Sequence, residues 1–398
     1  MQTELEKKHL AKFASKKAAQ FKESVIREMS RLAAQYGAIN LAQGLPDYPA
    51  PDELKHAAHD ALFADVNQYA ITWGDKLLRN AISEKALAYN KITCDPETEI
   101  TVTCGATEAM IAAMLALVDP DEEVIVFEPF YENYNPDTIL SGATPRYVKM
   151  RAPDWSFDEA ELEKAFNDKT RAIIINTPHN PTGKIFNKEE LSVIARLCQK
   201  WGVLCITDEI YEHILYDDAV HVSPGALPGM EDLTVSINSL SKTYSVTGWR
   251  VGWAIANKNL TQHIRKVHDF LTVGSPAPLQ RAAVTALKLP QSFYDELSVE
   301  YNQRRSSMLN TLDAAGIPYF KPQGAYYAFC DISSFGYDSD IDMMNYLVKD
   351  VKVAVVPGSS FFHDPIEGKK YVRMCFSRKM ETMELAHKYL LNVKKKGA

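Results

Sequence analysis

The stretch Ser236–Ala256, SINSLSKTYSVTGWRVGWAIA, places a single lysine, Lys242, between two apolar runs of the kind that form buried strands. Ser239 and Ser241 precede this lysine, and Arg250 follows it shortly afterwards. A lone lysine is usually solvated, because burying its ammonium group is costly. The stretch is therefore either a loop tip that needs solubility or the site of a reactive amine. The remainder of the chain has to decide between these two interpretations.

Short apolar runs recur on both sides of this stretch from about Glu99 onward. They are EITVTC, EEVIVFE, TRAIIINTP, GVLCITDE, LTVSINS and WRVGWAIA, and helical periodicity separates most of them. Continuous apolar strands that alternate with amphipathic helices predict a mostly parallel sheet covered on both faces. Ligands of such α/β sheets bind beyond the carboxyl ends of the strands.

The two ends of the chain follow other patterns. FKESVIREMSRLAAQY has the spacing of an amphipathic helix, and a Pro-rich extended segment follows it. After about Pro290 the pattern is a helix, then hairpin-like strands, then a last helix. We therefore expect an N-terminal helix and arm (1–50), a large domain (51–290) and a smaller α+β domain (291–398). The arm is expected to join the small domain and to take part in dimer contacts.

Composition excludes several classes of function. The 398 residues carry a net charge of −7, which provides no general basic field for nucleic acid or for an anionic membrane surface. No apolar run is long enough to span a bilayer, and the N-terminus lacks a signal-peptide pattern. The six cysteines form no C-x-x-C pair, and His56 and His59 have no third metal ligand beside them. A cytoplasmic protein without a metal site is expected.

Polar side chains cluster where the apolar runs end. Gly105-Ala106-Thr107 follows ITVTC and opens a helix, whose free N–H groups suit a phosphate. Asn180 lies in TPHNPTGKIF just after a strand, and Asp208 ends GVLCITD, with Tyr211 three residues later. Arg373, within YVRMCFS, is either part of a structural ion pair or suited to bidentate capture of a carboxylate.

Taken together and in this order, these motifs resemble the class I/II aminotransferases of pyridoxal 5′-phosphate (PLP) fold type I. The most specific matches are HNPTG, DEIY and S-L-S-K followed by G-W-R-x-G, and the resemblance extends from INLAQGLPDYPAP to YVRMCFS. It implies an α/β large domain with a mostly parallel seven-stranded sheet between helices, plus a smaller α+β domain. It also implies a homodimer with shared active sites.

The resemblance assigns roles to individual residues. Lys242 matches the lysine that carries PLP as a Schiff base and moves the substrate proton, and Asp208 matches the acid that pairs with the pyridine nitrogen. Asn180 and Tyr211 match the partners of the cofactor's phenolic oxygen, while Arg373, with Asn180 and the backbone near Gly44, matches the site for the substrate α-carboxylate. The remaining matches are the phosphate ligands Gly105, Ala106, Thr107, Ser239 and Arg250, the ring-stacking Tyr131, and Tyr69, which reaches the neighbouring subunit's phosphate.

The implied reaction moves an amino group from an L-amino acid to a 2-oxo acid such as 2-oxoglutarate, with ping-pong kinetics through pyridoxamine phosphate. A neutral or aromatic donor, methionine or kynurenine, is expected, and Trp73, Tyr326 and Tyr327 are candidates for an apolar side pocket. Aspartate stays open as a donor, although Arg281 looks like part of a helix rather than a second carboxylate ligand. A C–S β-lyase on the same scaffold is the main alternative, and an aminotransferase-like ligand-sensing module is a second.

Overall fold

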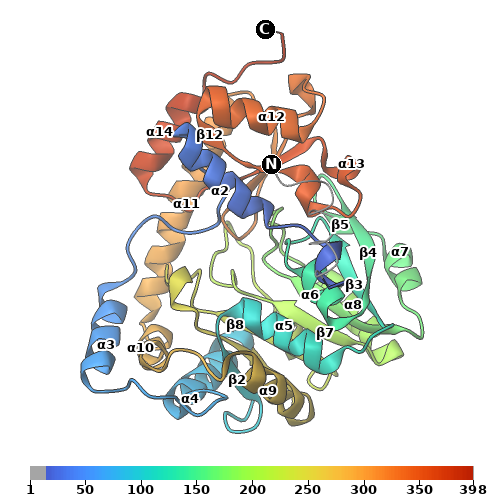
Figure 1. Ribbon diagram of the computed structural model, residues 1–398, viewed down its shortest axis with the longest axis vertical. Helices are drawn as coiled ribbons and strands as arrows, with labels where there is room; N and C mark the ends of the chain where they lie inside the picture. Colours follow the sequence, from blue (N-terminus) through green and yellow to red (C-terminus); the bar gives the residue numbers. More distant parts are fainter. Residues whose placement is uncertain (1–14, 398) are drawn as a thin grey trace, which may run out of the picture.

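An eight-stranded sheet organises the larger part of the computed structural model, which describes residues 15–397 (Figure 1). Five neighbouring strands run parallel, β9 is antiparallel to both of its neighbours, and the short β5 pairs antiparallel at one edge. In spatial order the strands are β2 (Ile100–Thr103), β9 (Gly252–Ile255), β8 (Thr234–Ser239), β7 (Leu204–Asp208), β6 (Thr170–Asn176), β3 (Glu123–Glu128), β4 (Thr144–Arg151) and β5 (Ser156–Phe157). The predicted mostly parallel sheet is confirmed, and the two-residue β5 is the strand beyond the expected seven.

Both faces of this sheet are buried under helices, which explains the unbroken apolar runs. In β6, Ile173 and Ile175 belong to the apolar core that includes α8, whereas Ile174 belongs to the core on the α5 side. The helices of this region are α3 (Asp52–Phe63), α4 (Lys76–Lys85), α5 (Ala106–Leu117), α6 (Tyr134–Ser141), α7 (Glu159–Ala165), α8 (Lys188–Trp201), α9 (Lys258–Thr272) and α10 (Ala277–Leu287).

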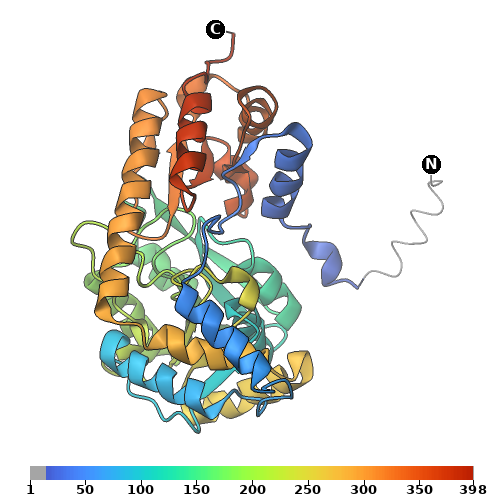
Figure 2. The same ribbon diagram turned by 90° about the vertical axis from the view of Figure 1, so that its left-hand side faces the viewer.

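The C-terminal part forms a second, smaller sheet, in the upper half of Figure 1. Its antiparallel strands, in spatial order, are β10 (Tyr319–Phe320), β11 (Tyr327–Asp331), β14 (Tyr371–Cys375) and β13 (Val356–Pro357). The helices around it are α11 (Gln291–Ala314), α12 (Asp340–Tyr346), α13 (Pro365–Gly368) and α14 (Met380–Leu390). Figure 2 shows α11, in orange, running alongside both parts of the molecule.

The N-terminal segment packs against this smaller part. Helix α2 (Val25–Tyr36) begins four residues after Phe21, where the predicted helical pattern starts. The Ser24 hydroxyl caps its first turn by accepting the Arg27 N–H, and the helix ends at Gly37, which has a left-handed backbone. Strand β1 (Ile39–Asn40) then pairs in parallel with β12 (Val353–Ala354). The domain boundaries at residues 50 and 290 stay predictions.

Among the described residues, no helix combines the length and apolar character that a bilayer crossing requires. Several short helical turns complete the backbone. The single 3₁₀ or π turns are Ala18–Gln20, Ala86–Asn90, Pro224–Ala226, Thr247–Trp249, Ser333–Phe335, Leu347–Val351 and Gly358–Phe361.

Candidate active site

A cavity of about 1820 Å³ lies at the carboxyl ends of the parallel strands. Asn176 and Asp208 end β6 and β7 in register, and Ser239 ends β8 beside them. Of the residues predicted from the sequence, the cavity is lined by Gly44, Ala106, Thr107, Tyr131, Asn180, Asp208, Tyr211, Ser239, Lys242 and Arg250. The sheet therefore brings together residues as far apart in the sequence as Ala106 and Arg250, as the strand-end rule predicts, and the N-terminal arm adds Gly44.

Lys242 projects into this cavity from the turn after β8. Its amine donates to the Gly44 carbonyl at 3.0 Å and lies 5.9 Å from the ring centre of Tyr211. Burial disfavours the ammonium form and lowers the pKa of Lys242 to about 8, although Asp208 and the Cys375 thiol act in the opposite direction. An amine with this pKa is neutral for part of the time near neutral pH, which a nucleophile requires.

Asp208 is a buried carboxylate with few partners. Burial raises its pKa to about 6, and the Tyr134 hydroxyl, which donates to Oδ2 at 2.8 Å, opposes this rise. Asn176 donates to the Asp208 main-chain carbonyl and accepts the Asn180 N–H at 2.7 Å, so it fixes both strand ends. No role was predicted for Tyr134 or Asn176, although Tyr134 lies in the EPFYENY motif and Asn176 ends the apolar run of β6.

Arg250 and the start of α5 form a cradle for an anion. The guanidinium donates to the Thr247 carbonyl at 3.0 Å and to the Cys104 carbonyl at 3.3 Å. Gly105, with φ +81°, lies so close beneath it that a Cβ there would collide with the guanidinium. The connection between β8 and β9 has two non-glycine residues with left-handed backbone, Ser245 and Arg250, each with φ +56°. Gly248, the residue from which conformational freedom would be expected, lies in an ordinary 3₁₀ turn.

Arg373 lies on β14 behind the cavity wall and is fully buried. It donates to Asn180 Oδ1 and to the Ala42 carbonyl, each at 2.7 Å, and its guanidinium lies 4.2 Å from the ring centre of Tyr327. Its Nε has no hydrogen-bond partner. A buried guanidinium with an unused donor is suited to pairing with an acidic group.

The residues expected to form a side pocket are only partly brought together. Tyr327 lines the cavity and shares a hydrogen bond of 2.9 Å with the Tyr211 hydroxyl. Tyr326 is fully buried, and its hydroxyl donates to the Gly44 carbonyl at 2.9 Å. Trp73 does not line the cavity of its own chain, where its ring packs against the Arg265 guanidinium, so its place in a side pocket stays a prediction. Tyr69 is 85% exposed and also lies outside the cavity of its own chain.

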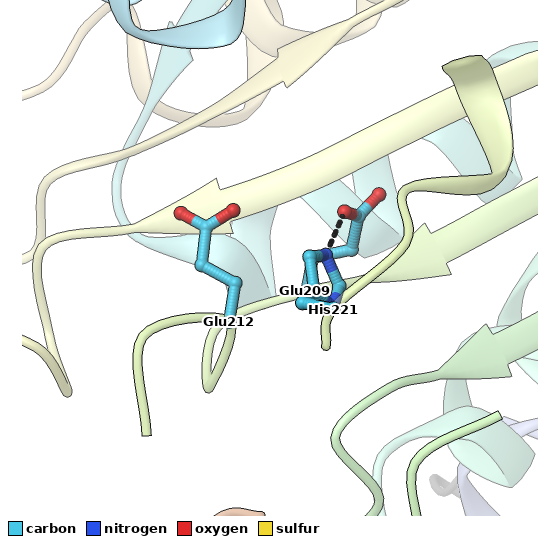
Figure 3. A group of neighbouring side chains, drawn as sticks. All are labelled: Glu209, Glu212 and His221. Carbon is cyan, nitrogen blue, oxygen red and sulfur yellow. Dashed lines mark hydrogen bonds and ion pairs between the residues drawn. The ribbon is translucent and has the colours of Figure 1, made fainter. Parts of the chain in front are cut away.

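A second buried polar cluster, made of Glu209, Glu212 and His221, follows directly after Asp208 (Figure 3). Glu209 accepts hydrogen bonds from Thr207 and Ser223 and is 2.7 Å from His221 Nε2. Glu212 is paired with Lys85 and Asn90; burial works against its ionisation, but the attraction of Lys85 and the neighbouring histidines lowers its pKa to about 2. Because protein donors already occupy both carboxylates, we interpret the cluster as an ion-pair network.

The donor set of the cavity fits PLP. It combines a neutralisable amine, a buried carboxylate that can face a protonated ring nitrogen, and a helix N-terminus with an arginine for a phosphate. Gly105 supplies the space that a closely held phosphate needs, because a larger residue would collide with Arg250.

Comparison with known proteins decides the family. The family model described as aminotransferase class I and II matches residues 36–390. The chain belongs to this family. Class I and II aminotransferases of this fold use PLP, so the protein is a PLP-dependent transaminase.

Relatives of this aminotransferase have the same fold and differ in their named substrates. Kynurenine–oxoglutarate transaminase 3 of Rattus norvegicus is 36% identical over an alignment of 396 positions, and this alignment covers 92% of this chain and 87% of that protein. The solved N-succinyldiaminopimelate aminotransferase of Mycobacterium tuberculosis superposes with a TM-score of 0.92 at 35% identity, covering 95% and 99% of the two chains. YbdL of Escherichia coli, reported to have a methionine aminotransferase function, also gives 0.92, at 33% identity and with 96% and 100% covered.

Proposed function

We propose that this aminotransferase transfers the amino group of a neutral or aromatic L-amino acid, such as methionine or kynurenine, to a 2-oxo acid such as 2-oxoglutarate. The observation that carries this proposal is the Lys242 amine, with its lowered pKa, in the same cavity as Asp208 and as Asn180, which accepts a hydrogen bond from Arg373. The named activities of the kynurenine and methionine relatives support this donor class. Aspartate stays a second candidate donor.

The proposed roles follow from position. Arg250, with Ser239 and the N–H groups of Ala106 and Thr107, holds the cofactor phosphate, and Tyr131 packs against the ring. Asp208, kept anionic by Tyr134, holds the protonated ring nitrogen, and Asn180 and Tyr211 hold the phenolic oxygen.

Arg373 holds the substrate α-carboxylate beside Asn180 and Gly44. The bound cofactor supplies an electron sink for negative charge at the substrate Cα. Lys242 is the residue that holds the cofactor covalently, and its amine, once free, takes the Cα proton and returns it. The aromatic rings of Tyr211, Tyr326 and Tyr327 around Lys242 exclude water from this transfer.

We also propose that the protein is a homodimer with shared active sites. Phe63, Tyr69 and Phe270 are large apolar side chains that are 78%, 85% and 92% exposed. The loop that carries Tyr69 and the helix that carries Phe270 meet where Thr72 contacts His268. An interface there would bury these side chains and bring Tyr69 to the partner's phosphate site. A cytoplasmic location and the lack of nucleic-acid or membrane partners stay predictions.

A half-reaction screen tests the proposed activity. Each amino acid is added to the PLP-loaded protein while the cofactor absorbance is recorded; donors are expected to bleach it, and a 2-oxo acid is expected to restore it. Lys242→Ala is expected to abolish turnover, while Lys266→Ala, at an exposed position on α9, keeps it. Steady release of pyruvate and ammonia from cystathionine without a 2-oxo acid would support the β-lyase instead, which no comparison favours.

A further inference from the structure

A buried imidazole–carboxylate pair lies outside the cavity, next to the loop Cys104–Gly105 of the anion cradle. His268 of α9 and Glu108 in the first turn of α5 approach to 2.8 Å between Nδ1 and Oε1. The His268 side chain is fully buried, and the Glu108 side chain is 8% exposed. Neither residue lines the cavity, and the roles proposed above do not use them.

The contacts of His268 define its protonation state. Nε2 lies 2.7 Å from the Thr72 carbonyl, which can only accept, so Nε2 carries a proton. Nδ1 faces the Glu108 carboxylate, whose other oxygen accepts the Cys104 N–H at 2.8 Å. Both ring nitrogens therefore face acceptors, as an imidazolium requires. Burial opposes this charge, but the hydrogen bond to Glu108 raises the pKa of His268 above its ordinary value.

Few other groups can influence this pair. Asp269, on the same helix, adds a further negative charge, and the Thr272 hydroxyl lies 3.4 Å from Nδ1. The Cys104 thiol beside Glu108 points to the Gly274 carbonyl at 3.5 Å. Glu108 is thus the main partner that holds the imidazolium.

The two ends of the pair contact two functional loops. Glu108 binds the N–H of Cys104, and the carbonyl of the same residue accepts Arg250 Nη2. Glu108 and Arg250 therefore clamp the residue that precedes Gly105 in the anion cradle. At the other end, His268 binds Thr72, three residues after Tyr69, the residue proposed to reach the partner's phosphate.

We propose that Glu108 and His268 are positioning residues that hold the phosphate-binding loop Cys104–Gly105 in its bound form and tie it to the loop carrying Tyr69. This inference rests on the proposed function, because it assigns the cofactor phosphate to that loop. The charge of the pair sets its strength. As the pH rises through the raised pKa of His268, the imidazolium is lost and the hold on the phosphate loop weakens.

The test measures binding of pyridoxamine phosphate to the apoprotein between pH 6 and pH 10. This probe cannot bond covalently to Lys242, and the titration of Lys242 affects all variants with an intact lysine equally. At pH 7, Glu108→Ala is expected to bind roughly tenfold more weakly than the unchanged protein, as loss of a charge-assisted hydrogen bond implies. Glu108→Gln keeps an acceptor for Cys104 but removes the charge, so the fall in affinity at alkaline pH attributed to His268 is expected to disappear.

His263→Gln is the matched control, because His263 lies exposed on the same helix. It is expected to leave the affinity and its pH profile unchanged. Nuclear magnetic resonance of ¹⁵N-histidine gives a second readout: His268 is expected to stay doubly protonated to a higher pH in the unchanged protein than in Glu108→Gln.

The outcomes separate the two proposals. If the unchanged protein binds pyridoxamine phosphate and transaminates, but Glu108→Gln and Glu108→Ala keep its affinity and pH profile, the positioning role is wrong. If the unchanged protein neither binds the probe nor transaminates, the proposed function itself fails.

Discussion

Lys242 and Asp208 face the same cavity, and burial shifts their pKa values in opposite directions, to about 8 and about 6. Capture of PLP by the apoprotein needs a neutral amine at Lys242 and an anionic Asp208. The capture rate is therefore expected to rise with pH up to about 8 and to be slowest below about 6, as followed by stopped-flow absorbance. A rate that does not change between pH 6 and pH 9 would contradict both assignments.

Tyr134 tunes Asp208 through a single hydrogen bond of 2.8 Å. Replacing Tyr134 with Phe removes a donor to the charged form, so the pKa of Asp208 should rise further, by about one unit. The acidic limb of the kcat/KM profile is then expected to move to higher pH by the same amount. Tyr319→Phe is the matched control, because Tyr319 donates to the exposed Asp313 at 3.3 Å. An unshifted limb in Tyr134→Phe would show that the hydrogen bond does not tune Asp208.

The sequence predicts residues that end strands better than residues that reach a site from a helix. Lys242, Asp208 and Asn180 follow apolar runs directly, and the cavity contains all three. Tyr134 reaches Asp208 from α6, and no local pattern encodes that approach. The left-handed backbone of Arg250 was equally invisible, because nothing in its identity favours a positive φ.

At the scale of elements, the junction of β2 and α5 depends on Gly105. Its φ of +81° and the Arg250 guanidinium directly above it leave no room for a side chain. Gly105→Ala is expected to weaken PLP binding by more than tenfold and to cost about 1–2 kcal/mol of stability. Gly202→Ala, at a left-handed helix end with nothing within 4 Å, should cost similar stability without loss of cofactor. Equal PLP affinity in the two variants would argue against the cradle.

The ion pair between Lys85 of α4 and Glu212 ties the loop after β7 to a helix of the outer layer. Lys85→Met leaves Glu212 buried without its cation, so the free energy of unfolding is expected to fall by about 3–5 kcal/mol in denaturant titrations. Lys200→Met breaks the exposed pair with Glu163 and is expected to cost about 1 kcal/mol at most. Similar losses of unfolding free energy in both variants would show that the buried pair contributes no more to stability than the exposed one.

The pH dependence of the same pair has a defined sign. The folded pKa of Glu212, about 2, lies below its ordinary value, so its contribution to stability is present above the unfolded pKa. That contribution is lost as the pH falls through about 2.

Across the elements, the parallel strands were predictable because burial on both faces gives continuous apolar runs. The antiparallel direction of β9 was not predictable, because its run GWAI has the same composition as a parallel strand. The two-residue β5 is too short to leave a pattern at all.

At the scale of the whole molecule, the N-terminal segment pairs with the C-terminal part of the chain. Strand β1 pairs with β12 across more than 300 residues, and Arg378 donates to the carbonyls of Asn40 and Gln43. Gly44, whose carbonyl accepts the Lys242 amine, follows directly after this junction. The smaller part of the molecule therefore contributes to the surroundings of Lys242, and its residues Tyr327 and Phe362 line the same cavity. Motif matching found Gly44, but only the structure shows how it is held.

A shared active site makes one further prediction for the whole molecule. If Tyr69 completes the partner's site, both Lys242→Ala and Tyr69→Ala homodimers are defective, but a mixed dimer of the two chains contains one intact site. That site takes Lys242 from the Tyr69→Ala chain and Tyr69 from the Lys242→Ala chain. Mixing the variants under mild denaturant and refolding them together is therefore expected to restore up to about one quarter of the unchanged activity, since half of the dimers are mixed and each has one intact site of two. If Tyr69 acts within its own chain, or if the protein is a monomer, mixing gives no more than the average of the separate variants. The control co-refolds Lys242→Ala with Tyr319→Phe, which keeps both Lys242 and Tyr69. It measures the activity that a chain with an intact lysine contributes by itself.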